Sequence, residues 1–186
     1  AVIWSGKKCN YKSLMENINK SELFIDSHKI KPGMVVAIIG DFSPNSMALL
    51  LALIRKACII VPLTNPSNKN ENRLFDIAQV EFVLRINEDD VVTADTVSQK
   101  SDNDYYNIIR EKEHPGLVLF TSGTSGEPKA AVHDLLVLLE KFKTRRKTLR
   151  TLNFLLFDHW GGLNTLFYIL SNGGTVITTK DRKPET

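Results

Sequence analysis

The stretch MVVAIIGDFSPNSMALLLALIRKACIIVP, Met34 to Pro62, predicts a strand, a helix and a second strand in immediate succession. Met34 to Gly40 is an apolar run rich in β-branched residues that ends in polar turn residues, which is the pattern of a strand buried on both faces. Ser43-Pro44 supplies a helix cap and a proline for the first turn, and Cys58 to Pro62 is another short apolar strand. Two buried strands joined by a helix indicate parallel pairing in a layered α/β fold.

The segments on both sides of this unit continue the same alternation of strands and helices. Upstream, we expect a short hairpin and then a helix, at Val2 to Trp4, Lys8 to Asn10 and Tyr11 to His28. Downstream, we expect strands at Glu81 to Ile86, Gly116 to Ser122, Asn153 to Phe157 and Gly173 to Thr179, and helices at Arg73 to Gln79, Leu135 to Phe142 and Leu163 to Ser171. Asn87 to Asn107 is polar and is predicted to be a surface excursion. The predicted fold is therefore a layered α/β domain with a mostly parallel sheet flanked by helices.

Composition places the chain among soluble globular proteins and excludes several classes of partner. Its 186 residues are 42% hydrophobic and 24% charged, and the net charge of +3 comes from 24 basic and 21 acidic residues, which argues against nucleic acid or a membrane surface. No apolar run reaches the roughly 18 residues of a membrane span, and the N-terminus is not a signal peptide, so we predict a cytoplasmic protein. Cys9 and Cys58 lack metal-site spacing, and the carboxylates Glu88 to Asp90 are expected to be solvated, so no metal site is predicted.

The stretch FTSGTSGEPKAAVHD, Phe120 to Asp134, predicts a phosphate-binding loop at the end of a buried strand. Ligands of open α/β sheets bind at the carboxyl ends of the strands. Backbone N–H groups of small residues, hydroxyl groups and a lysine suit phosphate oxygens. The Walker A spacing is not met, because Gly123 and Gly126 are three residues apart and Lys129 does not follow the second glycine directly. The GxGxxG pattern is not met either, which disfavours a P-loop hydrolase and a dinucleotide-binding protein.

The nine residues TSGTSGEPK, Thr121 to Lys129, resemble the phosphate-loop signature of the adenylate-forming (AMP-binding) superfamily. This superfamily includes acyl-CoA synthetases, adenylation domains of nonribosomal peptide synthetases and luciferases. Ser125 stands where threonine is usual, and Ala130 stands where glycine is usual. Gly33 to Leu84 and FLLFDHWGGLNTLFYILSNGGTVI, Phe154 to Ile177, are similar to further blocks of the family in the same order. The resemblance covers residues 2 to 186.

This resemblance implies an ATP-dependent ligase that activates a carboxylic acid as an acyl adenylate and then forms a thioester. Magnesium would accompany the ATP, and the thiol acceptor would be coenzyme A or the pantetheine of a carrier protein. His159 falls on the position of a histidine near the carboxylate substrate, with a purely structural histidine as the alternative, and no catalytic residue is implied within this chain. The acid stays open among fatty, aromatic and amino acids, so an acyl-CoA synthetase of fatty acid metabolism is one of the alternatives. The implied phosphate-binding residues are Thr121, Ser122, Gly123, Thr124, Ser125, Gly126 and Lys129.

The extent of the resemblance leads us to expect an N-terminal fragment, cut at both ends. The family's adenine and ribose segments and its small C-terminal domain with a catalytic lysine have no counterpart in these 186 residues. We therefore expect residues 1 to 186 to hold phosphate but to be inactive alone, and to expose a sheet edge through which two copies could associate. The alternative is a naturally short phosphate- or nucleotide-binding module without ligase activity.

Overall fold

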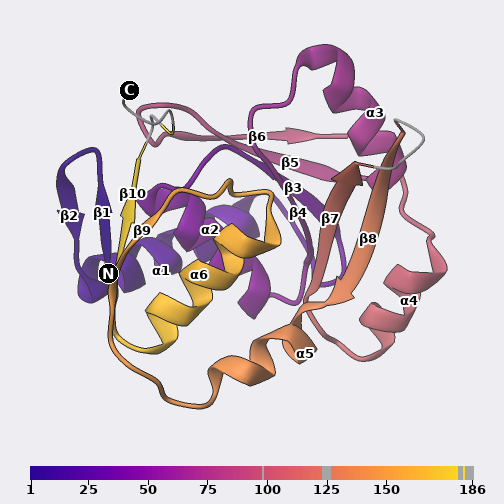
Figure 1. The fold of residues 1–186 in the computed structure, drawn as a ribbon. Helices are drawn as coiled ribbons and strands as arrows, with labels where there is room; N and C mark the ends of the chain where they lie inside the picture. The colour runs from indigo at the N-terminus through magenta and orange to yellow at the C-terminus, as the bar shows by residue number, and fades with distance from the viewer. Residues whose placement is uncertain (98, 123–126, 180–181, 183–186) are drawn as a thin grey trace.

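A computed structural model of the chain describes residues 1–97, 99–122, 127–179 and 182, and within these residues the strands form two sheets (Figure 1). The larger sheet has the strand order β6-β5-β3-β4-β7-β8, and the smaller sheet has the order β2-β1-β10-β9. Strands β5, β3, β4 and β7 are parallel, and the edge strands β6 and β8 are antiparallel to their neighbours. The predicted fold class, a layered α/β fold with a mostly parallel sheet, is confirmed.

The elements of the larger sheet are β3 (Val35–Ile39), β4 (Ile59–Leu63), β5 (Phe82–Ile86), β6 (Val92–Thr96), β7 (Gly116–Ser122) and β8 (Pro128–Asp134). The smaller sheet contains β1 (Val2–Trp4), β2 (Lys7–Cys9), β9 (Arg150–Asn153) and β10 (Thr175–Thr178). The helices are α1 (Tyr11–Ser27), α2 (Pro44–Arg55), α3 (Asn68–Ala78), α4 (Asp104–Glu111), α5 (Leu135–Leu139), which continues as a 3-10 turn (Glu140–Phe142), and α6 (Trp160–Ser171).

Strand β3 lies between two hydrophobic cores, one on each face of the larger sheet. Val36 and Ile38 belong to the core that also contains residues of α1, α2 and α6, whereas Val35, Ala37 and Ile39 belong to the core beneath α3 and α4. Successive side chains of a strand point to opposite faces, so every residue of β3 is buried. This explains why the run contains no polar residue, and Figure 1 shows helices on both sides of the sheet.

Helix α2 is buried on nearly all sides because it packs into the core that contains residues of both sheets. Ser43 caps it, since the Ser43 hydroxyl accepts a hydrogen bond from the Ser46 N–H at 3.1 Å, and the Ser46 hydroxyl accepts from the Ser43 N–H at 2.8 Å. Met47, Leu50 and Leu53 are fully buried. The cap and the proline predicted from Ser43-Pro44 are confirmed.

The segment Asn87 to Asn107, predicted to be an irregular surface excursion, contains a strand and the start of a helix. Strand β6 pairs antiparallel with β5, and Val92 and Ala94 pack against the core while Thr93 and Asp95 are exposed. An edge strand with one solvent-exposed face alternates polar and apolar residues and therefore lacks a continuous apolar run. Helix α4 begins after Asn103, whose side chain accepts from the Tyr105 N–H at 2.9 Å.

The predicted strand at Asn153 to Phe157 is wrong by about three residues, since β9 ends where the prediction begins. Strand β9 pairs with β10 only as far as Asn153. Phe154 and Leu156 are then exposed, and the carbonyl of Leu156 accepts from the His159 N–H at 3.2 Å in the turn that leads into α6. Of the apolar residues in this segment only Phe157 is buried, and it is buried in the core without strand pairing.

The remaining predicted elements agree with the structure within a few residues, apart from α3 and β8. Helix α3 begins five residues before the predicted start at Arg73, and β8 was not predicted as a strand. Among the described residues, no helix has both the length and the apolar character that a bilayer crossing requires.

Candidate functional site

The carboxyl ends of β5, β3, β4 and β7 lie at one edge of the larger sheet because these strands are parallel. Three features of the chain come together along this edge: the β7–β8 hairpin, the segment that begins α6, and a cavity between the two sheets. This edge is where open α/β sheets bind their ligands.

The predicted phosphate loop connects β7 to β8. Gly123 to Gly126 lie outside the described residues, and Ser122 is the last residue of β7. Thr121 and Lys129 are opposite one another in the antiparallel pair, so their side chains share one face of the hairpin. Both are exposed, and the Thr121 hydroxyl donates to the Lys129 carbonyl at 3.5 Å. Within the described part of the chain the Lys129 ammonium has no hydrogen bond or ion pair, so this face presents an uncommitted positive charge.

The hairpin is attached to α3 by an ion pair between Arg73 and Glu127. Glu127 is the first described residue after the loop, and Arg73 lies on the exposed side of α3. From the sequence, Arg73 is expected to brace the fold rather than to contact a ligand. The pair brings a charged residue from a distant part of the sequence to the exit of the predicted phosphate loop.

His159 is the N-cap of α6 and is exposed. Its Nδ1 accepts a hydrogen bond from the Gly161 N–H at 3.0 Å, which satisfies one of the unpaired donors at the start of the helix. A ring that accepts through Nδ1 is assigned the neutral tautomer with the proton on Nε2. His159 therefore offers one N–H donor, at Nε2, to a neighbouring group.

Gly162 allows the turn at the start of α6 to close. A Cβ atom at this position would lie 2.3 Å from the carbonyl oxygen of Leu156 and 3.1 Å from the ring of Phe42. The neighbouring Gly161 is less confined, because its closest neighbour is the end of the Leu155 side chain at 2.7 Å. The second of the two glycines is thus required by backbone packing.

Asp158 connects the start of α6 to the carboxyl edge of the larger sheet. Its Oδ2 accepts from the N–H of Thr64, the residue after β4, at 3.0 Å. Strand β4 is the neighbour of β7, which carries the predicted phosphate loop. From the sequence, His159 and the hairpin were expected to belong to one site. They lie on the same edge of the sheet, where the neighbouring strands β4 and β7 end.

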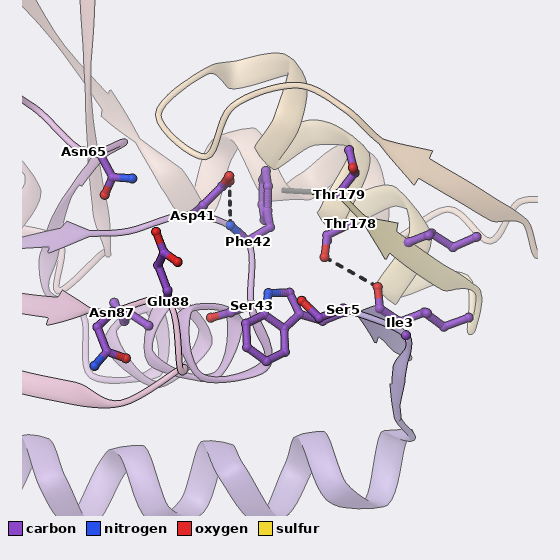
Figure 2. A pocket seen from close by; sticks show the side chains of 14 residues that line it. Ile3, Ser5, Asp41, Phe42, Ser43, Asn65, Asn87, Glu88, Thr178 and Thr179 are labelled. Atoms are coloured by element: carbon purple, nitrogen blue, oxygen red, sulfur yellow. Dashed lines mark hydrogen bonds between the residues drawn. The ribbon is translucent and has the colours of Figure 1, made fainter. Parts of the chain in front are cut away.

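A cavity of about 820 Å³ opens between the two sheets at the carboxyl ends of β3 and β5 (Figure 2). Asp41 and Glu88 line it from the larger sheet, and Ile3 and Thr178 line it from the smaller sheet. Asp41 is paired with Arg182 at 2.6 Å. The cavity volume suits a small organic ligand, but two carboxylates at its wall are unfavourable for a triphosphate. This cavity was not predicted from the sequence, and His159 does not line it.

Two acidic residues have roles that the sequence did not indicate. Asp134 accepts from Nδ1 of His114 at 2.9 Å. Asp90 was expected to be solvated, but its carboxylate accepts from the Asn45 N–H in the first turn of α2 at 3.2 Å, and burial raises the pKa of Asp90. Among the described residues, no three His, Cys, Asp or Glu side chains are gathered in a way that could hold a metal ion.

The mostly parallel sheet, the β7–β8 hairpin at its carboxyl edge and the cavity beside that edge define an α/β protein with a candidate ligand-binding edge. The family described as AMP-binding enzyme matches residues 1–186. The chain therefore belongs to the AMP-binding enzymes, as the resemblance of TSGTSGEPK implied, and this family uses ATP.

Curated proteins give the same relationship. The hybrid PKS-NRPS synthetase xenE of Xenoacremonium sinensis is 27% identical over 93% of this chain, which corresponds to 5% of that protein. Nonribosomal peptide synthetase 2 of Gibberella zeae is 27% identical over 69% of this chain, and the matched region makes up 3% of that protein. The chain thus spans a small part of the length of these curated relatives.

Solved structures share the fold of the chain. The N-terminal subdomain of Klebsiella oxytoca NpsA in complex with 3-hydroxyanthranilyl-AMSN superimposes with a TM-score of 0.75 at 18% identity, covering all of this chain and 50% of that one. NpsA-ThdA, an artificially fused Adenylation-PCP di-domain NRPS from the same organism, gives a TM-score of 0.74 at 16% identity and is covered to 40%. The chain spans half or less of the length of these solved proteins.

Proposed function

We propose that this chain supplies the phosphate-binding part of a site in which ATP activates a carboxylic acid as an acyl adenylate. The observation that carries this proposal is the pair Thr121 and Lys129, which places a hydroxyl group on one face of a hairpin at the carboxyl edge of the sheet, beside an ammonium group that has no hydrogen bond or ion pair among the described residues. A phosphate group needs both hydrogen-bond donors and positive charge. Membership of the AMP-binding enzymes supports nucleotide as the source of the phosphate.

In the proposed reaction, a carboxylate oxygen attacks the α-phosphorus of ATP, and the bond to the oxygen that bridges the α- and β-phosphates breaks. Pyrophosphate leaves with the electron pair of that bond, so negative charge grows on the β-phosphate. Lys129 and the hydroxyl groups and backbone N–H groups of the loop would stabilise this charge, and Mg²⁺ would arrive with the nucleotide. The loop residues in this role are Thr121, Ser122, Gly123, Thr124, Ser125 and Gly126.

His159 is proposed to bind the carboxylate substrate as a hydrogen-bond donor. Its Nδ1 is used as a helix cap, so the Nε2–H is the group available for a carboxylate oxygen. His159→Asn tests this role, because asparagine also caps helices while it removes the Nε2–H. We expect His159→Asn to keep the stability of the wild type and to weaken binding of the acid in the complete adenylating enzyme.

The relatives favour an amino acid or an aromatic acid over a fatty acid as the substrate. One of the curated relatives is a nonribosomal peptide synthetase, and the solved NpsA subdomain holds a 3-hydroxyanthranilyl compound. For the thiol acceptor, a carrier-protein pantetheine is favoured over coenzyme A, because NpsA-ThdA joins an adenylation domain to a carrier protein. An acyl-CoA synthetase of fatty acid metabolism has less support from these relatives.

Two measurements test the proposed function. In calorimetric titrations, the 186-residue chain is expected to bind ATP and inorganic pyrophosphate, and Lys129→Ala is expected to weaken both by roughly tenfold. In ATP–pyrophosphate exchange with a panel of amino, aromatic and fatty acids, we expect no activity from these residues alone and activity from a chain extended to include the family's adenine and ribose segments and its small C-terminal domain. Absence of binding would overturn the proposal, whereas binding without exchange by the extended chain would favour the alternative, a phosphate-binding module without ligase activity.

Strand β9 is proposed as the edge through which two copies associate. It is the last strand of the smaller sheet, and apolar side chains along and beside it are exposed: Leu149, Leu152, Phe154 and Leu156. Unpaired strand edges with exposed apolar residues favour pairing with another strand. Sedimentation of the chain at several concentrations is expected to reveal a dimer, which Leu152→Lys abolishes.

A further inference from the structure

Glu127 places a negative charge where the proposed function requires an anion to bind. It is exposed, it is the first described residue after the loop, and it stands two residues before Lys129. In an extended chain, residues two apart point to the same side. Glu127 and Lys129 stand two positions apart, so an unpaired Glu127 carboxylate would be expected to turn toward the Lys129 ammonium and to repel phosphate oxygens near that face.

The structure pairs Glu127 with a different cation. The guanidinium of Arg73 forms the ion pair with Glu127, and Lys129 has no partner within the described residues. Helix α3 holds Arg73 in place through the buried side chains of Phe75 and Ala78 on its opposite side. Glu71, a neighbouring carboxylate on the same helix, is already bound to Arg85 and does not compete for Arg73.

We propose that Arg73 is a positioning residue for anion binding: by neutralising Glu127, it keeps Lys129 available to the phosphates. This inference rests on the proposed function of the hairpin. Removal of Arg73 leaves Glu127 without its partner, and the nearest cation along the strand is Lys129. The Glu127 carboxylate would then pair with the Lys129 ammonium, which would no longer be available to the phosphates of the nucleotide.

The effect belongs to ligand binding rather than to folding. The side chains of Arg73 and Glu127 are 45% and 66% exposed, and ion pairs at such positions contribute little to stability. Their influence on a multiply charged ligand is larger, because an uncompensated carboxylate repels each phosphate group and also withdraws Lys129 from them. Screening by salt should reduce this influence.

The test uses the complete 186-residue chain with ATP and inorganic pyrophosphate as probes, titrated in a calorimeter at low salt. Arg73→Met is expected to weaken binding of both probes by roughly three- to tenfold, and Arg73→Lys to restore it to within about twofold. The double variant Arg73→Met with Glu127→Gln is expected to bind like the wild type, because no carboxylate remains to be neutralised. The matched control is Arg55→Met, which removes an exposed arginine paired with Glu22 elsewhere on the surface and should leave binding unchanged.

Each outcome decides the inference. Wild-type affinity in Arg73→Met overturns it, and so does a double variant that stays weak, since Arg73 would then act on the nucleotide directly or through the fold. Thermal unfolding of each variant, expected within about 2 °C of the wild type, separates loss of affinity from loss of structure. If the wild-type chain binds neither probe, the proposed function fails, and the role of Arg73 fails with it.

Discussion

The backbone N–H of Thr64 donates to the carboxylate of Asp158 at 3.0 Å and thereby joins the end of β4 to the start of α6. A hydrogen bond to a charged acceptor contributes about 1.5 to 3 kcal/mol. We expect Asp158→Ala to lower the free energy of unfolding by about 2 kcal/mol in urea titrations. Asp158→Asn retains an acceptor oxygen and should lose less than half as much, and equal losses in the two variants would contradict a role for this hydrogen bond.

Gly162 should be the less replaceable of the two glycines at the start of α6. In Gly162→Ala, the new methyl group would lie 2.3 Å from the carbonyl oxygen of Leu156, which cannot move without opening the turn. We expect a loss of about 3 kcal/mol of unfolding free energy or failure to fold. Gly161→Ala is the control: it meets the end of the Leu155 side chain, which can rotate away, and should cost less than about 1 kcal/mol.

Asp134 should make the stability of the protein depend on acid pH. Burial raises the pKa of Asp134, but hydrogen bonds from His114, Val137 and Lys112 and the charge of His114 together lower it more, so the pKa lies below its ordinary value. The stability contributed by this carboxylate is present above the unfolded-state pKa of about 3.9 and is lost as pH falls through the folded-state pKa. Asp134→Asn should therefore be less stable than the wild type at pH 7, and the difference should shrink below about pH 4.

The check is a series of urea titrations from about pH 7 to about pH 2. Asp95→Asn on β6 is the control: its carboxylate is exposed and pairs with Arg85 at the surface, and loss of such a pair should cost less than about 1 kcal/mol. If the difference in unfolding free energy between Asp134→Asn and the wild type stayed constant across this range, the charge of Asp134 would not contribute to stability.

Asp90→Asn is expected to stabilise the protein at neutral pH. Burial raises the pKa of Asp90, against hydrogen bonds from Ser43 and Asn45 that lower it, so the folded state disfavours the charged form. Asp90 also has a φ of 64°, a region that asparagine adopts readily. The variant keeps an acceptor for the Asn45 N–H and removes the partly buried charge, so we expect a gain of at most about 1 kcal/mol at pH 7 after screening by solvent.

The sign of this effect follows from the raised pKa. The unfolding free energy of the wild type falls as pH rises from the unfolded-state pKa of about 3.9 through the higher folded-state pKa. The advantage of Asp90→Asn should accordingly appear above about pH 4 and be small near about pH 3. A destabilised Asp90→Asn at neutral pH would mean that the carboxylate is favoured by the N-terminus of α2 more strongly than burial opposes it.

The buried parallel strands could be predicted from the sequence because burial on both faces restricts the residue types within each strand by itself. A strand covered on both faces must be apolar throughout, and β3 and β4 have that pattern. Strands β6 and β8 could not be recognised in the same way, because each lies at an edge and has polar residues on one face. The apolar run Phe154 to Phe157 gave the opposite error, since burial of Phe157 in the core does not require strand pairing.

The candidate site was predictable only where a short motif carries its chemistry. TSGTSGEPK indicated phosphate binding because the glycines, hydroxyl residues and lysine that suit phosphate stand together in one short segment of the sequence. The contacts that support the site join residues far apart in the chain, as Thr64 with Asp158 and Arg73 with Glu127 do, and neither partner has a pattern that points to the other. The cavity between the sheets was missed for the same reason, since its walls come from five separate segments.

The pairing of β1 with β10 has a consequence for the order in which the chain folds. Val2 and Ile3 lie in register with Val176 and Ile177, so the smaller sheet closes only when β1 and β10 are both present. The larger sheet, by contrast, is built from residues 35 to 134 alone. During synthesis on the ribosome, we expect the larger sheet to assemble first, while the hairpin of β1 and β2 remains without its parallel neighbour until β10 emerges.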